Sequence, residues 1–212
     1  MIRKGQPWER AVGGPPDVEV TGGDAELAAA VTTHPGARIA FSPRESDLAR
    51  SVGLVGPGRD VELALDGLRW PGGIAVNALV WGTAPDHLRW WTRAMRVQVD
   101  TGERTLFEGR ATGVVIASGQ FVHGFDVVPR GHPGDGRLEV QVYALPRFER
   151  RRLRARLASG THVPHPDLPA AAGTRVQLLG ERRLPLEVDG RSAGTTDRLT
   201  VEVVPDACRL LA

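Results

Sequence analysis

Two short segments contain residue types that suit phosphate chemistry. The loop Gly22-Gly23-Asp24 lies between an expected strand and an expected helix, and Asp189-Gly190 forms a second turn that Arg191 follows directly. Glycines in such a loop let backbone N–H groups come close to a phosphate at the start of a helix. Glu26 opposes this use, because it places a negative side chain near where a phosphate would lie. The first loop therefore has only half of the features of a phosphate site.

Histidines and the cysteine give weaker signals. His162 and His165 flank a Val-Pro pair, but the further cysteine or histidine ligands of a zinc site do not follow at the usual spacing. A role in a loop is favoured over metal binding. Cys208 is the only cysteine and stands close to Leu210 and Leu211, so we expect it to fill the core and assign it no chemistry.

A basic segment is expected to form an amphipathic helix over residues 145–157. Its apolar stripe consists of Leu145, Phe148, Leu153 and Leu157. Its basic face contains the candidate membrane-surface residues Arg147, Arg150, Arg151 and Arg154, together with Arg152 and Arg156. Two interpretations stay open: a solvated face, or attraction to anionic lipid headgroups at about 1 kcal/mol per basic residue.

Aromatic residues argue against nucleic acid as a partner, because Trp90 and Trp91 are not interleaved with the basic face. For these two residues and Trp81, packing in the core or between lobes is preferred over a place at the rim of a lipid cleft.

Composition predicts a folded protein without a membrane span. The chain has 212 residues, with 27 Lys plus Arg against 25 Asp plus Glu for a net charge of +2. Its apolar runs are far shorter than the roughly 20 residues that cross a bilayer, and no apolar signal core is present at the N-terminus. We therefore predict a cytoplasmic protein. A second expectation is peripheral association with the inner face of the membrane. Heavy use of Arg with little Lys suggests a bacterial source.

Periodicity divides the chain into a leader and two lobes. Residues 1–16 are polar and predict a flexible leader. Residues 17–70 alternate strands and helices and predict parallel βα units. The expected strands are 18–20 and 38–41, and the expected helices are 25–31, 46–52 and 60–65.

Residues 71–212 are expected to be mainly antiparallel β-structure. The expected strands are 73–81, 95–100, 111–116, 120–128, 138–143, 174–178, 186–188, 199–203 and 209–211. The predicted fold class is thus α/β plus all-β, with a trimmed parallel α/β lobe followed by an antiparallel β-sandwich lobe.

Several of these segments together resemble a known family. The segments 160–166, 175–178, 184–190 and 199–211 are similar in order and spacing to the C-terminal domain of bacterial diacylglycerol kinase-like lipid kinases, relatives of the sphingosine kinases. Residues 117–121, Gly124, Pro129 and 135–140 are similar to the family's strand, glycine turn and Asp-Gly motif. The resemblance extends from about Asp17 to the C-terminus. It implies the family's two-lobed fold, with ATP and Mg²⁺ as cofactors of an active member.

The nucleotide loops depart from the family pattern. The family has Gly-Gly-Asp-Gly-Thr, and here Ala25 and Glu26 replace the last two residues. The family's second loop has a glycine-rich lead before Asp47, which residues 43–46 replace here. Gly22, Gly23, Asp24 and Asp47 are thus the candidate residues of a degenerate nucleotide site. The family's first strand and helix should precede Val18, so the adenine-side wall is expected to be missing or to come from another chain.

The position of the general base also differs. In the family a glutamate follows Asp-Gly and removes the proton of the lipid hydroxyl, and here that position is Arg191. A guanidinium cannot accept a proton at neutral pH, and loss of a general base costs about 10²- to 10⁴-fold in rate. Glu187 and Asp189 are weak substitute candidates. Asp135 matches the aspartate of a structural magnesium site, although a plain hairpin turn is the favoured interpretation.

Three functional hypotheses follow. The first is a lipid-kinase homologue that has lost catalysis and binds a lipid, an anionic membrane surface or a partner protein. The second is an active ATP-dependent kinase of diacylglycerol or a related lipid, with Glu187 as its base. The third is an assembly protein, because a trimmed parallel sheet exposes edges that a homo-oligomer or a partner chain would cover.

Overall fold

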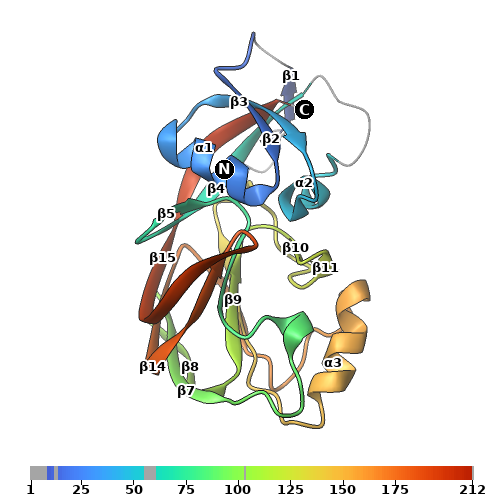
Figure 1. Cartoon of the computed structure of the whole chain (residues 1–212), viewed down its shortest axis with the longest axis vertical. Helices are drawn as coiled ribbons and strands as arrows, with labels where there is room; N and C mark the ends of the chain where they lie inside the picture. Colours follow the sequence, from blue (N-terminus) through green and yellow to red (C-terminus); the bar gives the residue numbers. More distant parts are fainter. Residues whose placement is uncertain (1–8, 12–13, 55–60, 103, 212) are drawn as a thin grey trace.

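The computed structural model describes residues 9–11, 14–54, 61–102 and 104–211, and it is mostly β-sheet with few helices (Figure 1). The strands are β1 (Glu9–Ala11), β2 (Val18–Gly22), β3 (Arg38–Pro43), β4 (Val61–Trp70), β5 (Gly73–Ala75), β6 (Ala78–Gly82), β7 (Met95–Thr101), β8 (Arg104–Ala111), β9 (Gly113–Ala117), β10 (Phe121–Val122), β11 (Phe125–Asp126), β12 (Leu138–Val142), β13 (Ala170–Gly173), β14 (Arg175–Val188) and β15 (Arg191–Leu211). The helices are α1 (Asp24–Thr33), α2 (Asp47–Ser51) and α3 (Arg150–Arg156), and the 3₁₀ turns are η1 (Pro85–His87) and η2 (Leu157–Ser159).

The first lobe contains two βα units, as the sequence predicts. β2 pairs in parallel with β3, and β3 pairs in parallel with the last residues of β15. Leu27 of α1 and Leu48 of α2 pack in one apolar cluster with Ile39 of β3 and Leu210 of β15. The C-terminal strand thus supplies the third parallel strand of this lobe (Figure 1).

The predicted helix at 60–65 is wrong, because residues 61–70 form strand β4; residue 60 lies outside the described residues. β4 pairs antiparallel with β15 over two stretches that join the lobes. Its Glu-Leu-Ala-Leu sequence favours a helix locally, but Leu63 and Leu65 are each 1% exposed and pack in the first-lobe cluster. Pairing with β15 therefore overrides the local helix propensity.

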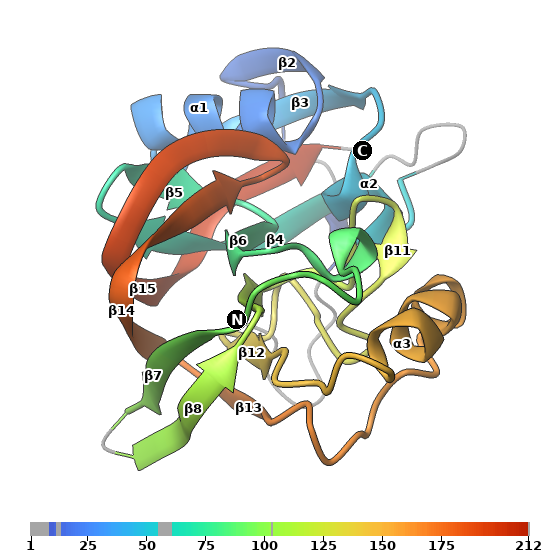
Figure 2. The same ribbon diagram turned by 60° about the horizontal axis from the view of Figure 1, so that its bottom comes forward.

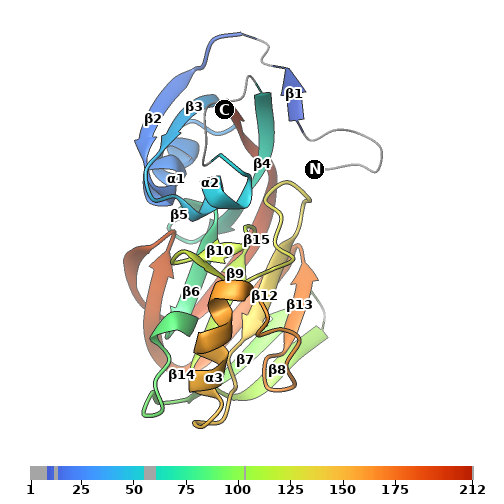
Figure 3. The ribbon, with the colours of Figure 1, turned by 90° about the vertical axis from the view of Figure 1, so that its right-hand side faces the viewer.

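The second lobe is antiparallel around the order β15-β14-β6-β9-β12-β13, with β7 beside β14 and β8 beside β7. β6 is buried on both faces. Leu79 and Trp81 pack against residues of β7, β14 and β15, while Ala78 and Val80 pack in another cluster that includes Leu153 of α3. Helix α3 lies in front of these strands in Figure 3, and Figure 2 shows it beside the β11 hairpin.

Other elements differ from the sequence prediction in detail. β1 occupies part of the predicted leader and pairs with β4, whereas residues 1–8 and 12–13 lie outside the described residues. Only the hairpin β10–β11 forms within the strand predicted at 120–128, and β8 and β13 were not predicted. α3 begins at Arg150 rather than at Leu145, with Pro146 in the turn before it. Cys208 fills the core as expected, and burial raises the pKa of its thiol to about 12.

Among the residues described, no helix combines the length and apolar character that crossing a membrane requires.

Candidate functional site

Half of the predicted site residues meet at a cavity of about 660 Å³. The loop after β2, helix α2, the β10–β11 hairpin and the β14–β15 turn line it. Six of the candidate site residues contribute to its wall: Gly23, Asp24, Asp47, Glu187, Asp189 and Arg191. Gly22, Asp135 and the arginines of α3 do not line this cavity.

Asp24 joins the two helices of the first lobe. It is the first residue of α1, and its carboxylate accepts hydrogen bonds from the Ser46 hydroxyl and from the backbone N–H of Leu48 at 3.1 Å. Burial raises the pKa of Asp24 to about 6, and these hydrogen bonds only partly oppose the shift. The aspartate of the Gly-Gly-Asp loop therefore holds the start of α2 in place.

Helix α2 holds the β10–β11 hairpin of the second lobe. The Asp47 carboxylate accepts the backbone N–H of Gly124 at 2.9 Å, and the Arg50 guanidinium donates to the Gly124 carbonyl at 2.8 Å. Ser51 adds a bond by accepting the N–H of Gln120 at 2.9 Å. Burial raises the pKa of Asp47. These contacts fix the hairpin tip over the cavity.

Glu26 and Arg191, two of the charged departures from the family pattern, form an ion pair across the cavity. Glu26 Oε2 also accepts the backbone N–H of Gly23 at 2.9 Å, which caps α1. That hydrogen bond is the largest cause that lowers the pKa of Glu26. The Glu26 carboxylate therefore already accepts the backbone N–H that the glycine loop presents at the start of α1.

Asp189 organises the backbone beside the cavity. It lies with Gly190 in a two-residue turn, with φ of 48° and 77°, between the paired residues Val188 and Arg191. Its carboxylate accepts three backbone N–H groups, those of Val76, Asn77 and Ala78, at 2.9–3.0 Å. Burial raises the pKa of Asp189 to about 7. The structure thus gives this carboxylate a scaffold role at the corner between β5 and β6.

Glu187 is not a free carboxylate. Its Oε1 is hydrogen-bonded to His123 Nε2, while His123 Nδ1 lies 3.0 Å from Asp86 Oδ1. His123 stands at the hairpin tip with φ of 53°, and Gly124 follows with φ of 77°. The bonds to Asp86 and to Glu187, in that order, raise the pKa of His123 to about 10. Glu187 therefore faces a protonated imidazole.

The remaining predicted metal candidates lie elsewhere. Asp135 Oδ1 accepts the N–H of Arg137 at 2.9 Å, which supports the turn interpretation. His162 is buried with Nε2 bonded to the carbonyl of Val127, and His165 Nδ1 accepts the N–H of Asp167. Neither histidine belongs to a cluster of metal-ligand side chains within the described part of the chain.

Two expectations for the α3 region need correction. Arg150 does not belong to an exposed basic face, because it is 4% exposed and donates to the carbonyls of Leu145, Arg89 and Thr92. Trp90 and Trp91 are 64% and 62% exposed rather than packed in the core. Trp81 does pack in the core, where it is fully buried.

The sequence identified several residues of this site but not the residues that they contact. Asp86, His87 and His123 were not singled out, because no local spacing connects the hairpin to η1. The Glu26–Arg191 pair did leave a signal, since the two departures from the family pattern have opposite charges.

Comparison with known proteins gives one family match and a set of solved structures with a similar fold. Residues 56–212 match the family model described as the YegS C-terminal NAD kinase beta sandwich-like domain. No curated protein matches the sequence.

Three solved structures illustrate the similarity. A diacylglycerol kinase from Bacillus anthracis str. Sterne is 15% identical with a TM-score of 0.73, over 92% of this chain and 76% of that one. An NAD kinase from Archaeoglobus fulgidus in complex with ATP is 11% identical with a TM-score of 0.52, over 92% and 78%. A yeast NADH kinase complexed with NADH is 12% identical with a TM-score of 0.54, over 92% and 61%. At identities this low, the structural similarity shows a common fold alone.

Proposed function

Because this chain belongs to the family of YegS C-terminal NAD kinase beta sandwich-like domains, we propose that it is a lipid-kinase homologue that has lost phosphoryl transfer and binds an anionic lipid surface. We also propose that its architecture is a parallel α/β lobe followed by an antiparallel β-sandwich lobe. The loss of phosphoryl transfer is inferred from the contacts of Glu26. One of its oxygens accepts a hydrogen bond from the glycine loop and the other pairs with Arg191.

The residues at this loop do not fit a nucleotide phosphate. A phosphate at a helix N-terminus needs free backbone N–H groups, and Glu26 already accepts the N–H of Gly23. The same carboxylate would repel a phosphate that approached α1. No step of ATP-dependent transfer is therefore assigned to this cavity.

The cavity also lacks a proton acceptor at the family's base position. Arg191 cannot accept a proton, and it is bound to Glu26. Glu187 lies nearby but is hydrogen-bonded to His123, whose pKa is raised to about 10. Glu187 would have to leave this partner to serve the active-kinase alternative.

A transfer assay separates the two alternatives. Labelled ATP, Mg²⁺ and diacylglycerol in mixed micelles would be supplied to the wild-type protein and to Glu187→Gln. We expect no difference between them and no saturable binding of ATP in calorimetry. Turnover in the usual kinase range of about 1–100 s⁻¹, lowered about 10²-fold or more by Glu187→Gln, would establish an active kinase instead.

Lipid binding is proposed from a mixed aromatic and basic surface. Trp90 and Trp91 are largely exposed and meet edge to face, with ring centroids 5.6 Å apart. Arg150 ties their loop to α3 through the carbonyls of Arg89, Trp90 and Thr92. Phe148, which is 73% exposed, lies just before that helix. Tryptophan beside arginine is typical of surfaces that lie at the headgroup level of a bilayer.

Vesicle binding tests this surface. We expect sedimentation with phosphatidylglycerol vesicles and little with phosphatidylcholine vesicles. The double variant Arg147→Gln/Arg151→Gln removes two exposed cations and should weaken binding about 30-fold, from about 1 kcal/mol for each residue. The control Arg183→Gln/Arg198→Gln removes the same charge from β14 and β15 and should leave binding unchanged. Equal losses in both variants, or equal binding to neutral vesicles, would contradict the proposed surface.

The assembly alternative rests on β2, which pairs with β3 and with no other strand among the residues described. Such an edge can accept a further strand from a second copy or a partner. Light scattering after gel filtration tests it. A monomer across the concentration range would remove the homo-oligomer, and a dimer that Val20→Pro disrupts would support it.

A further inference from the structure

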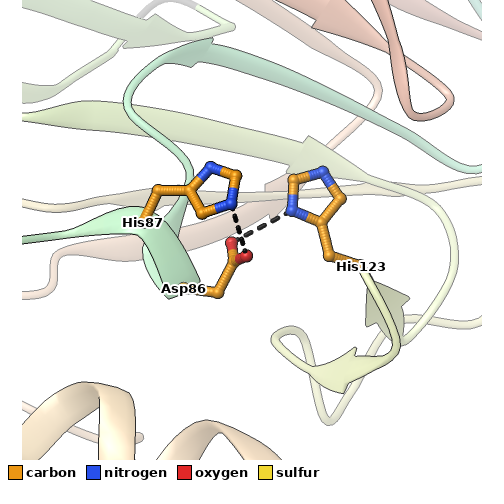
Figure 4. A group of neighbouring side chains, drawn as sticks. All are labelled: Asp86, His87 and His123. Atoms are coloured by element: carbon orange, nitrogen blue, oxygen red, sulfur yellow. Dashed lines mark hydrogen bonds and ion pairs between the residues drawn. The ribbon is translucent and has the colours of Figure 1, made fainter.

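A cluster of two histidines and one aspartate includes His123, which lines the cavity (Figure 4). Asp86 and His87 belong to η1, and His123 is at the tip of the β10–β11 hairpin. One ligand atom from each residue lies within 4.8 Å of the others. We propose that Asp86, His87 and His123 bind a Zn²⁺ ion.

The spacing of the three side chains suits one ion between them. Asp86 Oδ1 is 3.0 Å from His123 Nδ1, and Asp86 Oδ2 is 3.3 Å from His87 Nε2. Zinc bonds of about 2.0–2.1 Å in a tetrahedron place neighbouring ligand atoms roughly 3.4 Å apart. Each imidazole nitrogen is therefore close to ligand spacing from one oxygen of the aspartate, a different oxygen for each ring. Figure 4 shows both rings directed at the same carboxylate.

Glu187 supplies the support that a zinc-bound histidine usually has. Its carboxylate accepts from His123 Nε2, which leaves Nδ1 as the nitrogen that faces the cluster. A carboxylate on the far nitrogen fixes the tautomer and the ring orientation and makes the ligand nitrogen more basic. When the ion binds, the proton on Nδ1 passes to solvent. The proton on Nε2 remains on the imidazole and is donated in the hydrogen bond to Glu187.

The hairpin that presents His123 is held by groups outside the cluster. Asp47 accepts the Gly124 N–H and Arg50 donates to the Gly124 carbonyl, so α2 anchors the residue next to the ligand. Such anchoring lowers the entropy that the hairpin must lose on binding an ion.

The donor set indicates the class of ion. Two imidazoles and one carboxylate favour Zn²⁺ and similar transition ions, whereas Mg²⁺ prefers oxygen ligands alone. With neutral imidazoles, the carboxylates of Asp86 and Glu187 balance the two positive charges of the ion. Three protein ligands leave a fourth position, and the His87 side chain is 66% exposed beside a cavity of about 250 Å³. Water can therefore complete the coordination.

This inference does not rest on the loss of phosphoryl transfer or on lipid binding. The three ligands come from η1 and the hairpin, and neither the Glu26–Arg191 pair nor α3 contributes one. A kinase assay or a vesicle assay can therefore fail without affecting it.

Cobalt titration tests the site. Protein freed of metal by a chelator and of any affinity tag would be titrated with Co²⁺, whose visible absorption reports four- or five-coordinate binding, and Zn²⁺ would then displace it. We expect one equivalent in the wild-type protein. His87→Gln should lower the affinity about 100-fold or more, and Glu187→Gln about 10- to 100-fold, since it removes a supporting partner.

Two variants keep the result interpretable. His34→Gln removes an exposed histidine after α1 and should bind as the wild type does. His87 is largely exposed, so His87→Gln is expected to fold and circular dichroism would verify this. The absence of Co²⁺ absorption in the wild-type protein, or binding that survives His87→Gln, would overturn the site.

Discussion

Replacing Asp189 by alanine should destabilise the protein strongly, because this carboxylate is the shared acceptor for three backbone N–H groups. Val76, Asn77 and Ala78 donate to it at 2.9–3.0 Å, and these residues are 2%, 2% and 5% exposed. The family resemblance makes the same residue a weak candidate for catalysis. A scaffold role predicts a loss of stability that no substrate is needed to observe.

The size of the loss follows from the number of donors. Each buried N–H left without an acceptor costs about 1–3 kcal/mol, and alanine at φ of 48° adds about 1 kcal/mol because it lacks the local hydrogen bonds of aspartate. Water from the cavity can reach part of the vacated space, because Asn77, Ala78 and Asp189 all line it. We therefore expect a decrease of about 3–5 kcal/mol in the free energy of unfolding.

Urea unfolding followed by tryptophan fluorescence measures this decrease, and replacing the exposed Asp197 of β15 (Asp197→Ala) is the control with an expected change of about zero. Asp189→Asn should lose less, about 1–3 kcal/mol, since one oxygen can still accept the Asn77 and Ala78 donors. A loss below about 1 kcal/mol in Asp189→Ala, or a greater loss in the asparagine variant, would refute the reasoning.

Three further predictions concern other parts of the fold. Asp24 has a pKa raised from 3.8 to about 6 in the folded protein, so folding takes up a proton between these values and stability falls as pH rises through them. Asp24→Asn lacks this slope, and urea unfolding should show the wild type losing about 2–3 kcal/mol relative to the variant between about pH 4 and pH 7. Arg150→Met removes the donors that hold the loop before β7, so limited trypsin digestion should cut that loop faster, whereas exposed Arg152→Met should have no effect. Leu210→Ala should cost about 2–4 kcal/mol in urea unfolding because the residue is fully buried, and partly exposed Leu211→Ala should cost less than about 1 kcal/mol.

Helix α1 and the turn between β14 and β15 could be predicted because their signals are local. Ala25–Val31 combines helix-forming residues with an acidic first turn, and α1 forms there. The Asp189-Gly190 turn has the residues of a two-residue hairpin, and β14 and β15 pair across it. In each case a few neighbouring residues determine the outcome.

β4 and α3 show where local signals fail. Residues 61–65 have helix-forming composition, but β15 pairs with them from more than 140 positions away. The α3 segment has the expected apolar stripe, yet Arg150 turns inward because three carbonyls of the loop before β7 need a donor. Neither partner can be found from the residues of the element itself.

The same limit applies to the candidate site. Asp24, Asp47 and Asp189 could be named from their motifs, but the groups they bind lie 22 to 113 positions away in the chain. Their carboxylates turn out to bind hydroxyl and backbone donors of the protein itself. Residues that a motif identifies as catalytic or ligand-binding candidates thus hold two helices, a hairpin and a strand corner together here.

The charges of Glu26 and Arg191 are best understood together. An arginine at the base position alone would leave a cation facing the glycine loop, which would attract a phosphate. A glutamate in the loop alone would repel one and leave its second oxygen without a partner. The ion pair satisfies both groups and covers the N–H of Gly23 with a carboxylate from the protein itself. Two residues 165 positions apart thus meet in one contact, and a carboxylate of the protein itself occupies the N–H of Gly23.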